Sequence, residues 1–187
     1  MPTQYGEVSD PLILLHDIQT FIRTYVDIPF NFENVAARYV LMTWIYEKFH
    51  KVPYLRVIGQ YGVGKSRFLT VMRAICYHSL TIGVSPTEAG MFRMIDLYGG
   101  TLLLDEANFQ PKSQTFSSFL QIMNSGYERE ANIIRNEKIH EVYTPLTYAT
   151  FGPKIIATHG QYEDPGLESR FLTHFSELTS RKDIALQ

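Results

Sequence analysis

Gly59-Gln60-Tyr61-Gly62-Val63-Gly64-Lys65-Ser66 carries the strongest local signal in this sequence. The octapeptide matches the pattern G-x-x-x-x-G-K-[ST], in which glycines allow backbone N–H groups to surround a phosphate. A β-rich run over 54–58 precedes it, and a run with apolar residues at helical spacing over 67–77 follows it. This order of strand, glycine loop and helix predicts a phosphate-binding loop at the N-terminus of a helix.

The side chains of the loop have distinct expected roles. Lys65 is expected to reach the β- and γ-phosphates of ATP, and Ser66 to bind the Mg²⁺ ion that bridges them. The alternative is a glycine turn with no ligand. The full set of expected nucleotide-binding residues is Gly59, Gln60, Tyr61, Gly62, Val63, Gly64, Lys65, Ser66 and Arg67.

An acidic pair follows the next apolar strand of the sequence. The unbroken run Leu102-Leu103-Leu104 suits a strand covered on both faces, and Asp105 and Glu106 come directly after it. Carboxylates in this position lie at the carboxyl edge of the sheet, where the ligands of open α/β folds collect. We expect Asp105 to bind Mg²⁺ and Glu106 to act as the base that polarises the attacking water. A solvated acidic turn is the alternative.

The rest of the chain alternates between helical and strand patterns. Helices are expected over 35–49, 67–77, 85–95 and 114–124, and strands over 54–58, 80–84, 101–104, 154–157 and 171–175. The fold class is therefore α/β, a three-layer α/β/α P-loop NTPase sandwich with a mainly parallel five-stranded sheet and an inserted β-hairpin. Residues 1–30 are expected to form an N-terminal extension, and 31–187 one nucleotide-binding domain.

Composition limits the class of protein further. The chain has 187 residues, of which 45% are hydrophobic and 19% charged, as expected for one compact domain. Its formal net charge of −2 gives no overall attraction to nucleic acid, so DNA contact requires a local basic patch. Cys76 is the only cysteine, which excludes disulfides within the chain and fits the cytoplasm. No apolar run approaches the roughly 20 residues that span a bilayer, so no membrane partner is expected.

With these motifs the sequence resembles the additional-strand P-loop ATPases, and among them the AAA+ class. It is similar to helicase-like ATPases of mobile elements and viruses and to the minichromosome-maintenance helicases, from about Asn31 to Phe175. In this class the strand after the acidic one ends in a polar residue that senses the γ-phosphate. The run Lys154-Ile155-Ile156-Ala157-Thr158 matches, so the resemblance implies Thr158 as the sensor, with His159 beside it. A threonine that only ends a strand is the alternative.

A second motif supports the resemblance. Gly166-Leu167-Glu168-Ser169-Arg170-Phe171 resembles the Ser-Arg-Phe signature that carries the arginine finger in the minichromosome-maintenance group. The resemblance implies that Arg170 acts on the nucleotide of a neighbouring subunit, and therefore that the chain forms a homo-oligomeric ring or arc. An arginine paired locally with Glu163 or Glu168 is the alternative.

The inserted hairpin is expected over about 131–143. Its strands would be Asn132-Ile133-Ile134-Arg135 and Ile139-His140-Glu141-Val142, joined by Asn136-Glu137-Lys138. Helicases of the resembling group carry a hairpin at this point that projects into the ring pore and touches the DNA backbone. The resemblance therefore implies Arg135 and Lys138 as contacts to single- or double-stranded DNA. A hairpin that only packs against a neighbour is the alternative.

The C-terminal end departs from the AAA+ pattern. We expect the helical lid, with its second sensor arginine, to be absent or reduced to 176–187, where Arg181 is the candidate remnant. The leading hypothesis is the ATP-hydrolysing motor of an oligomeric DNA helicase or translocase from a mobile element or viral replication system. An AAA+-like switch or remodelling ATPase acting on a protein partner is the alternative. The expected catalytic residues are Lys65, Glu106, Thr158 and Arg170.

Overall fold

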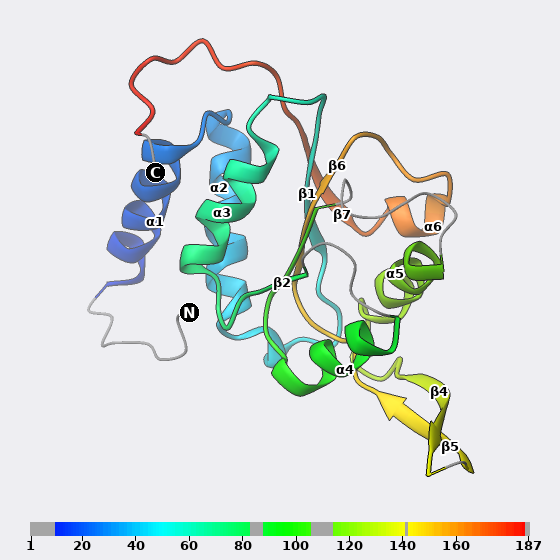
Figure 1. The fold of residues 1–187 in the computed structure, drawn as a ribbon. Helices are drawn as coiled ribbons and strands as arrows, with labels where there is room; N and C mark the ends of the chain where they lie inside the picture. The colour runs from blue at the N-terminus through cyan, green and yellow to red at the C-terminus, as the bar shows by residue number, and fades with distance from the viewer. Residues whose placement is uncertain (1–9, 83–87, 106–113, 141, 186–187) are drawn as a thin grey trace.

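The computed structural model describes residues 10–82, 88–105, 114–140 and 142–185 (Figure 1). Within these ranges, none of the helices combines the length and the apolar character that crossing a membrane requires. The elements, in chain order, are α1 (Pro11–Tyr25), α2 (Phe30–Thr43), the 3₁₀ helix η1 (Tyr46–Lys48), β1 (Tyr54–Ile58), α3 (Lys65–Ile75), β2 (Leu80–Ile82), α4 (Glu88–Tyr98), β3 (Leu102–Asp105), α5 (Gln114–Ser125), β4 (Ile133–Ile139), β5 (Val142–Tyr148), β6 (Lys154–Thr158), α6 (Pro165–Glu168) and β7 (Phe171–Phe175).

Five strands form one parallel sheet in the order β2-β3-β6-β1-β7. Helices α1, α2 and α3 cover one face, while α4, α5 and α6 lie on the other (Figure 1). This arrangement confirms the predicted α/β class with its five-stranded sheet. In the register of the sheet, Ile58 of β1 pairs with Thr158 of β6, and Asp105 of β3 pairs with Ala157 of β6. The carboxyl ends of β1, β3 and β6 therefore meet at one edge.

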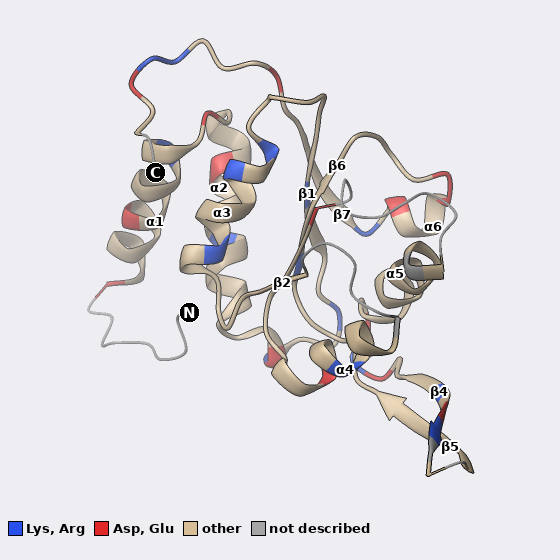
Figure 2. Cartoon of the chain, in the orientation of Figure 1, with Lys and Arg blue, Asp and Glu red and all other residues tan. Residues whose placement is uncertain are grey.

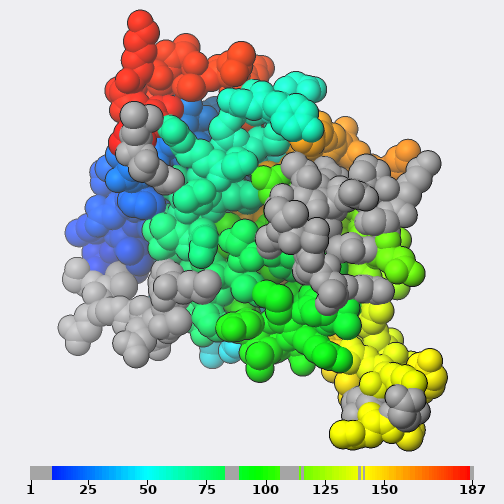
Figure 3. All heavy atoms as spheres, in the orientation of Figure 1, coloured from blue at the N-terminus to red at the C-terminus, as the bar shows by residue number. Residues whose placement is uncertain are grey.

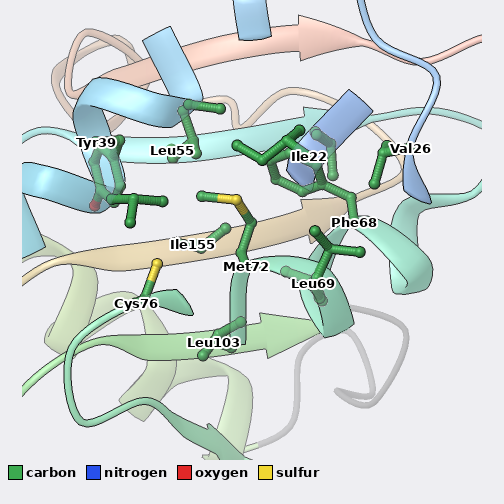
Figure 4. Packing of buried hydrophobic residues seen from close by; sticks show 14 of the residues in the cluster. Ile22, Val26, Tyr39, Leu55, Phe68, Leu69, Met72, Cys76, Leu103 and Ile155 are labelled. Atoms are coloured by element: carbon green, nitrogen blue, oxygen red, sulfur yellow. The ribbon is translucent and has the colours of Figure 1, made fainter. Parts of the chain in front are cut away.

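One half of the core lies between the sheet and helices α1–α3 (Figure 4). Alternate residues of β1 and β6, such as Leu55 and Ile155, point into this layer because side chains alternate between the faces of a strand. The helices supply the opposing surface, with Ile22 from α1, Tyr39 from α2, and Met72 from α3. Each of these side chains is almost fully buried, so the three helices and the sheet form one continuous core.

The helix α1 lies within the 1–30 segment expected to be an extension, and sequence analysis did not predict it. Its start is nevertheless well signalled, because the Asp10 carboxylate accepts a hydrogen bond from the Leu12 N–H and Pro11 occupies the first helical position. The next helix is also displaced from its predicted range of 35–49. It begins at Phe30, after the extended residue Pro29, and ends at Thr43, so 44–49 lie outside it.

The hairpin of β4 and β5 is longer than expected, and its predicted turn is wrong. Asn136, Glu137 and Lys138 belong to β4, and the strands join around His140, whose φ is +47°. Three polar residues in a row predicted a turn. In a strand, however, successive side chains face opposite sides, so neighbouring polar residues can lie in different surroundings. Glu137 faces inward and is buried. It forms an ion pair with Arg93 of α4 and accepts a 2.6 Å hydrogen bond from the hydroxyl of Tyr148 in β5.

A buried lysine joins three segments at the amino edge of the sheet. The Nζ atom of Lys154, the first residue of β6, donates to the carbonyls of Thr150 (2.8 Å), Gly152 (3.0 Å) and Gly126 (3.2 Å). It also lies 5.0 Å from the centroid of the Tyr54 ring. Burial lowers the pKa of Lys154 to about 7. The side chain thus links the end of α5 to the segment that leads into β6.

The pKa of Lys154 predicts a pH-dependent stability. The usual pKa of a lysine side chain is 10.5. Between pH 7 and 10.5, the Lys154 amine therefore carries a proton in the unfolded chain that it has lost in the folded chain. The contribution of Lys154 to the free energy of unfolding should therefore rise with pH, by up to about 1.4 kcal/mol per unit. Urea unfolding of wild type and Lys154→Met at pH 7 to 8.5 measures this rise as the difference between the two proteins.

Cys76 and the buried tyrosines titrate equally in both proteins, so their contributions cancel in that difference. Lys48→Met, which removes an exposed lysine, is the matched control and should follow the wild-type profile. Parallel profiles for wild type and Lys154→Met would show that the Lys154 amine keeps its ordinary protonation in the fold.

Candidate functional site

The glycine loop connects the carboxyl end of β1 to the first turn of α3. Gly62 and Gly64 have φ values of +83° and +85°, in the left-handed region that glycine adopts without a steric penalty. Gly64 is the N-cap of α3, so Lys65 and Ser66 are the first residues of the helix. The N–H groups of a first helical turn have no partners within the helix, and together with the helix dipole they attract anions. The local conformation therefore suits phosphate binding.

Lys65 lies inside the loop rather than in solvent, with only 8% of its surface exposed. Its Nζ atom donates to the carbonyl oxygens of Gly59 (2.6 Å) and Gln60 (2.7 Å). Burial lowers the pKa of Lys65, and the nearby Asp105 carboxylate opposes that shift. The ammonium group is thus held at the centre of the loop, where an anion on the helix N-terminus can contact it.

Ser66 and Asp105 meet across the edge of the sheet. The Ser66 hydroxyl donates a 3.1 Å hydrogen bond to Oδ2 of Asp105. Magnesium prefers oxygen ligands and retains several waters, so it binds through one or two protein groups together with phosphate oxygens. The described residues contain no cluster of three His, Cys, Asp or Glu side chains able to hold a metal. A hydroxyl and one carboxylate therefore fit Mg²⁺ bound together with a phosphate ligand.

These side chains surround a cavity of about 300 Å³. This volume lies at the lower end of the range for small-molecule sites. The described residues that line the cavity are Tyr61, Gly62, Gly64, Lys65, Ser66, Arg67, Asp105 and His159. Gly59, Gln60 and Val63 of the loop are not among them. Gly59 and Gln60 contribute the carbonyl groups that hold Lys65, and Val63 packs within the loop.

At the end of β6, the structure brings His159 rather than Thr158 to the cavity. Thr158 is fully buried, and its hydroxyl donates a 2.9 Å hydrogen bond to the carbonyl of Gly160. Its own carbonyl accepts from the Gly59 N–H at 3.2 Å, so Thr158 supports the start of the loop. The imidazole of His159 lies against the ring of Tyr61, with centroids 4.4 Å apart. The sequence motif indicated Thr158, with His159 only as its neighbour, although a residue just beyond the end of β6 lies at the same edge of the sheet as the glycine loop.

Of the two remaining expected catalytic residues, the structure places one. Glu106 lies outside the described residues. Arg170 directly precedes β7 and therefore lies at the amino edge of the sheet, opposite the glycine loop. Its guanidinium group donates to the carbonyls of Asn124 (2.6 Å) and Met123 (3.2 Å) at the end of α5, and it lies 5.2 Å from the Tyr127 ring centroid.

The local partners expected for Arg170 are different from those in the structure. Glu168 instead forms two 2.6 Å hydrogen bonds with Arg56, a β1 residue that is 1% exposed. The hydrogen bond from Arg56 is the main cause that lowers the pKa of Glu168. Arg181, the candidate lid remnant, donates to the carbonyls of Arg23 and Val26 and so caps the end of α1. Arg181 therefore lies against the C-terminal end of α1.

The two expected DNA contacts also differ in exposure. The hairpin projects from the body on the amino-edge side of the sheet (Figure 3), with acidic as well as basic residues (Figure 2). Arg135 faces α4, and its guanidinium carbon lies 4.4 Å from the Phe92 ring centroid. Lys138 is exposed on the opposite face. Lys138 is therefore the more exposed of the two, while Arg135 is partly covered.

The tight packing of Gly59 gives a stability prediction. A Cβ atom on Gly59 would lie 2.6 Å from Cγ2 of Val63 and 2.8 Å from the Ser176 carbonyl oxygen. Gly59→Ala should therefore lower the free energy of unfolding by about 1–3 kcal/mol, as overpacking does. A Cβ atom on Gly160 meets no atom within 4 Å, so Gly160→Ala is the matched control. Urea unfolding checks both variants, and equal stability of the two would contradict the close packing.

No family model matches the chain. No curated protein matches it either.

Proposed function

We propose that this protein binds ATP together with Mg²⁺ in the cavity at the carboxyl ends of β1, β3 and β6, and that it hydrolyses the nucleotide. The observation that carries the proposal is the convergence of three groups on one cavity: the Lys65 ammonium, the Ser66 hydroxyl and the Asp105 carboxylate. Each matches a different part of a magnesium-bound triphosphate. The left-handed glycines and the helix N-terminus support the same ligand.

The order of the strands supports the resemblance to the additional-strand ATPases. Strand β6 lies between β1, which leads into the glycine loop, and β3, which ends in Asp105. The residues after β6 therefore lie between the phosphate-binding loop and the acidic strand. A side chain in this position would lie beside the terminal phosphate of a bound nucleotide, and its contacts would change when hydrolysis removes that phosphate.

Each group has a role in the proposed reaction. The loop N–H groups and Lys65 bind phosphate oxygens, and the ammonium group has a proton to donate beside the two that the Gly59 and Gln60 carbonyls accept. Ser66 and Asp105 hold the magnesium ion, which neutralises charge on the phosphates when it is bound. Glu106, proposed from sequence alone, accepts a proton from the attacking water. The water oxygen then bonds to the γ-phosphorus, and the bridging P–O bond breaks with its electron pair left on ADP.

We further propose that hydrolysis drives a DNA helicase or translocase, with Lys138 of the hairpin as the nucleic-acid contact. The exposed position of Lys138 supports this role, while the packing of Arg135 on Phe92 argues against Arg135. A switch or remodelling ATPase acting on a protein is the second candidate. It is favoured by the apolar exposure of the hairpin, where Ile134 is 70%, Val142 64% and Tyr143 73% exposed.

A homo-oligomer with Arg170 acting in trans remains part of the proposal. For that role the guanidinium group has to leave the Met123 and Asn124 carbonyls and extend toward a neighbouring subunit. Its present contacts instead suit a local role, because they satisfy carbonyl groups at the end of a helix. Arg170 would therefore act in trans only when oligomer contacts replace those of α5.

Lys65→Ala should remove ATP binding and hydrolysis while leaving the fold intact, because the ammonium group contacts the loop and adds little to the apolar core. Glu106→Gln should bind ATP and Mg²⁺ normally but hydrolyse about a hundredfold to ten-thousandfold more slowly, the range typical of a lost general base. Calorimetric titration and a phosphate-release assay measure the two effects separately. Lys182→Ala, at an exposed lysine, is the control, and normal turnover by folded Lys65→Ala protein would refute the assignment.

DNA should stimulate the ATPase if the hairpin belongs to a motor. We expect single- or double-stranded DNA to raise the hydrolysis rate, and Lys138→Glu to remove that increase because it reverses the charge on the exposed face. The measurement is the ratio of phosphate-release rates with and without DNA at low and high salt. Lys182→Glu controls for total charge. A ratio of one for the wild type would favour the protein-directed switch.

A further inference from the structure

Arg67 is the second basic residue of the cavity, and its surroundings differ from those of Lys65. Both residues lie in the first turn of α3 and line the cavity. The Lys65 ammonium already donates to the carbonyls of Gly59 and Gln60. Among the residues that the structure describes, by contrast, none forms a hydrogen bond, ion pair or ring contact with the guanidinium group of Arg67. Its N–H donors are therefore open to a ligand in the cavity.

Partial burial makes this lack of a partner significant. Four other arginines form ion pairs with carboxylates, namely Arg23, Arg56, Arg93 and Arg181. Arg73, on the same helix as Arg67, has no such pair within the described chain, but it is exposed and water can solvate it. Arg67 is partly buried. Covering a charged group without a partner is unfavourable, so an anion bound in the cavity would stabilise this arrangement.

The geometry of α3 favours contact between Arg67 and the cavity. Arg67 is the third residue of the helix, which begins at Lys65. In an α-helix the Cα–Cβ bond is tilted toward the N-terminus, so a long side chain in the first turn extends back toward that end. The N-terminus of α3 borders the cavity, because Gly64, its N-cap, lines it. A guanidinium group on this turn therefore adds its charge to the attraction that the helix dipole exerts on an anion.

Arg67 also determines the net charge of the cavity lining. Its formally charged side chains are two cations, Lys65 and Arg67, and one anion, Asp105. With His159 counted as neutral, the described lining would carry no net charge without Arg67. A triphosphate keeps a net negative charge when one Mg²⁺ ion is bound to it, so the positive charge of Arg67 makes the lining complementary to that ligand.

The shape of the guanidinium group selects phosphate among the parts of a nucleotide. Its N–H groups lie in one plane and match two oxygens of the same phosphate, which gives a stronger contact than a single hydrogen bond. The proposed roles of Lys65, Ser66 and Asp105 are also directed at phosphate oxygens and at the metal ion. Recognition by these four residues would depend on the phosphate chain rather than on the nucleoside.

We propose that the guanidinium group of Arg67 binds the phosphate chain through two oxygens, and that the cavity therefore takes magnesium-bound inorganic tripolyphosphate as well as ATP. This inference rests on the proposed nucleotide site. It gives the side chain of Arg67 a role that the glycine-loop pattern does not assign, because the pattern ends at Ser66. It also identifies the class of ligand as a polyphosphate, with or without a nucleoside.

Calorimetric titration with Mg²⁺ and either inorganic tripolyphosphate or the non-hydrolysable β,γ-imido analogue of ATP tests the proposal. The wild type should bind both ligands. Arg67→Ala should lower both affinities by a similar factor, about tenfold to a hundredfold, the loss expected for hydrogen bonds to a charged group. Arg73→Ala removes the same type of side chain from an exposed position of α3. It is the matched control and should change either affinity by less than about twofold.

A second variant separates the two-oxygen contact from charge alone. Arg67→Lys keeps the positive charge but loses the planar arrangement of donors, so both affinities should fall between those of the wild type and Arg67→Ala. Binding by Arg67→Lys as tight as that of the wild type would overturn the two-oxygen contact. Thermal unfolding without ligand should give Arg67→Ala the same midpoint as Arg73→Ala, because neither variant removes a partner within the described chain. A lower midpoint for Arg67→Ala alone would show that the side chain has a structural role instead.

The outcomes distinguish this inference from the proposed function. If the wild type binds the ATP analogue but not tripolyphosphate, or if Arg67→Ala loses affinity for the ATP analogue alone, Arg67 acts on the nucleoside and the inference fails while the nucleotide site stands. The same holds if Arg67→Ala binds both ligands as tightly as Arg73→Ala does. If the wild type binds neither ligand, the proposed function fails, and the inference fails with it. Parallel losses of both affinities in Arg67→Ala support both.

Discussion

The pairing of β1 between β6 and β7 is the constraint on which the rest of the structure depends. All five residues of β1 are buried, and the strand hydrogen-bonds to a parallel neighbour on each side. A one-residue slip of this strand would turn Arg56 toward the apolar layer beneath α1–α3 and away from its partner Glu168. The register therefore fixes where β1 ends, and with it the start of the glycine loop, the first turn of α3 and the distance to Asp105.

Two buried basic side chains hold the layers around this strand together. Arg56 reaches Glu168 and Thr173, and so ties β1 to α6 and β7, while Lys154 joins the end of α5 to β6. A buried polar group is costly unless its hydrogen bonds are satisfied. Here Arg56 meets a carboxylate and a hydroxyl, and Lys154 meets several carbonyls, all of them fixed by the surrounding fold. These contacts give one arrangement of the layers an advantage over alternatives that leave the two groups without partners.

Much of the fold, but less of the site, could be predicted from the sequence. The glycine loop and the apolar strands are local patterns, so the parallel sheet and the meeting of Ser66 with Asp105 followed from them. The partners of Arg170 could not be predicted, because they are carbonyl oxygens, which every residue possesses. The hydroxyl direction of Thr158 likewise depends on the turn at Gly160. The hairpin turn was misplaced because Glu137 is held in the strand by Arg93 and Tyr148, partners that lie far from it along the sequence or across the hairpin.

The two carbonyl oxygens that hold Lys65 also determine where its charge can act. The carbonyls of Gly59 and Gln60 accept two of the three protons of the ammonium group, at 2.6 and 2.7 Å. An anion can therefore contact the third proton without displacing either carbonyl, beside the N-terminus of α3. In the proposed site, a polyphosphate would reach the ammonium group and the helix N-terminus through separate oxygens, whereas a small anion would contact fewer of these groups.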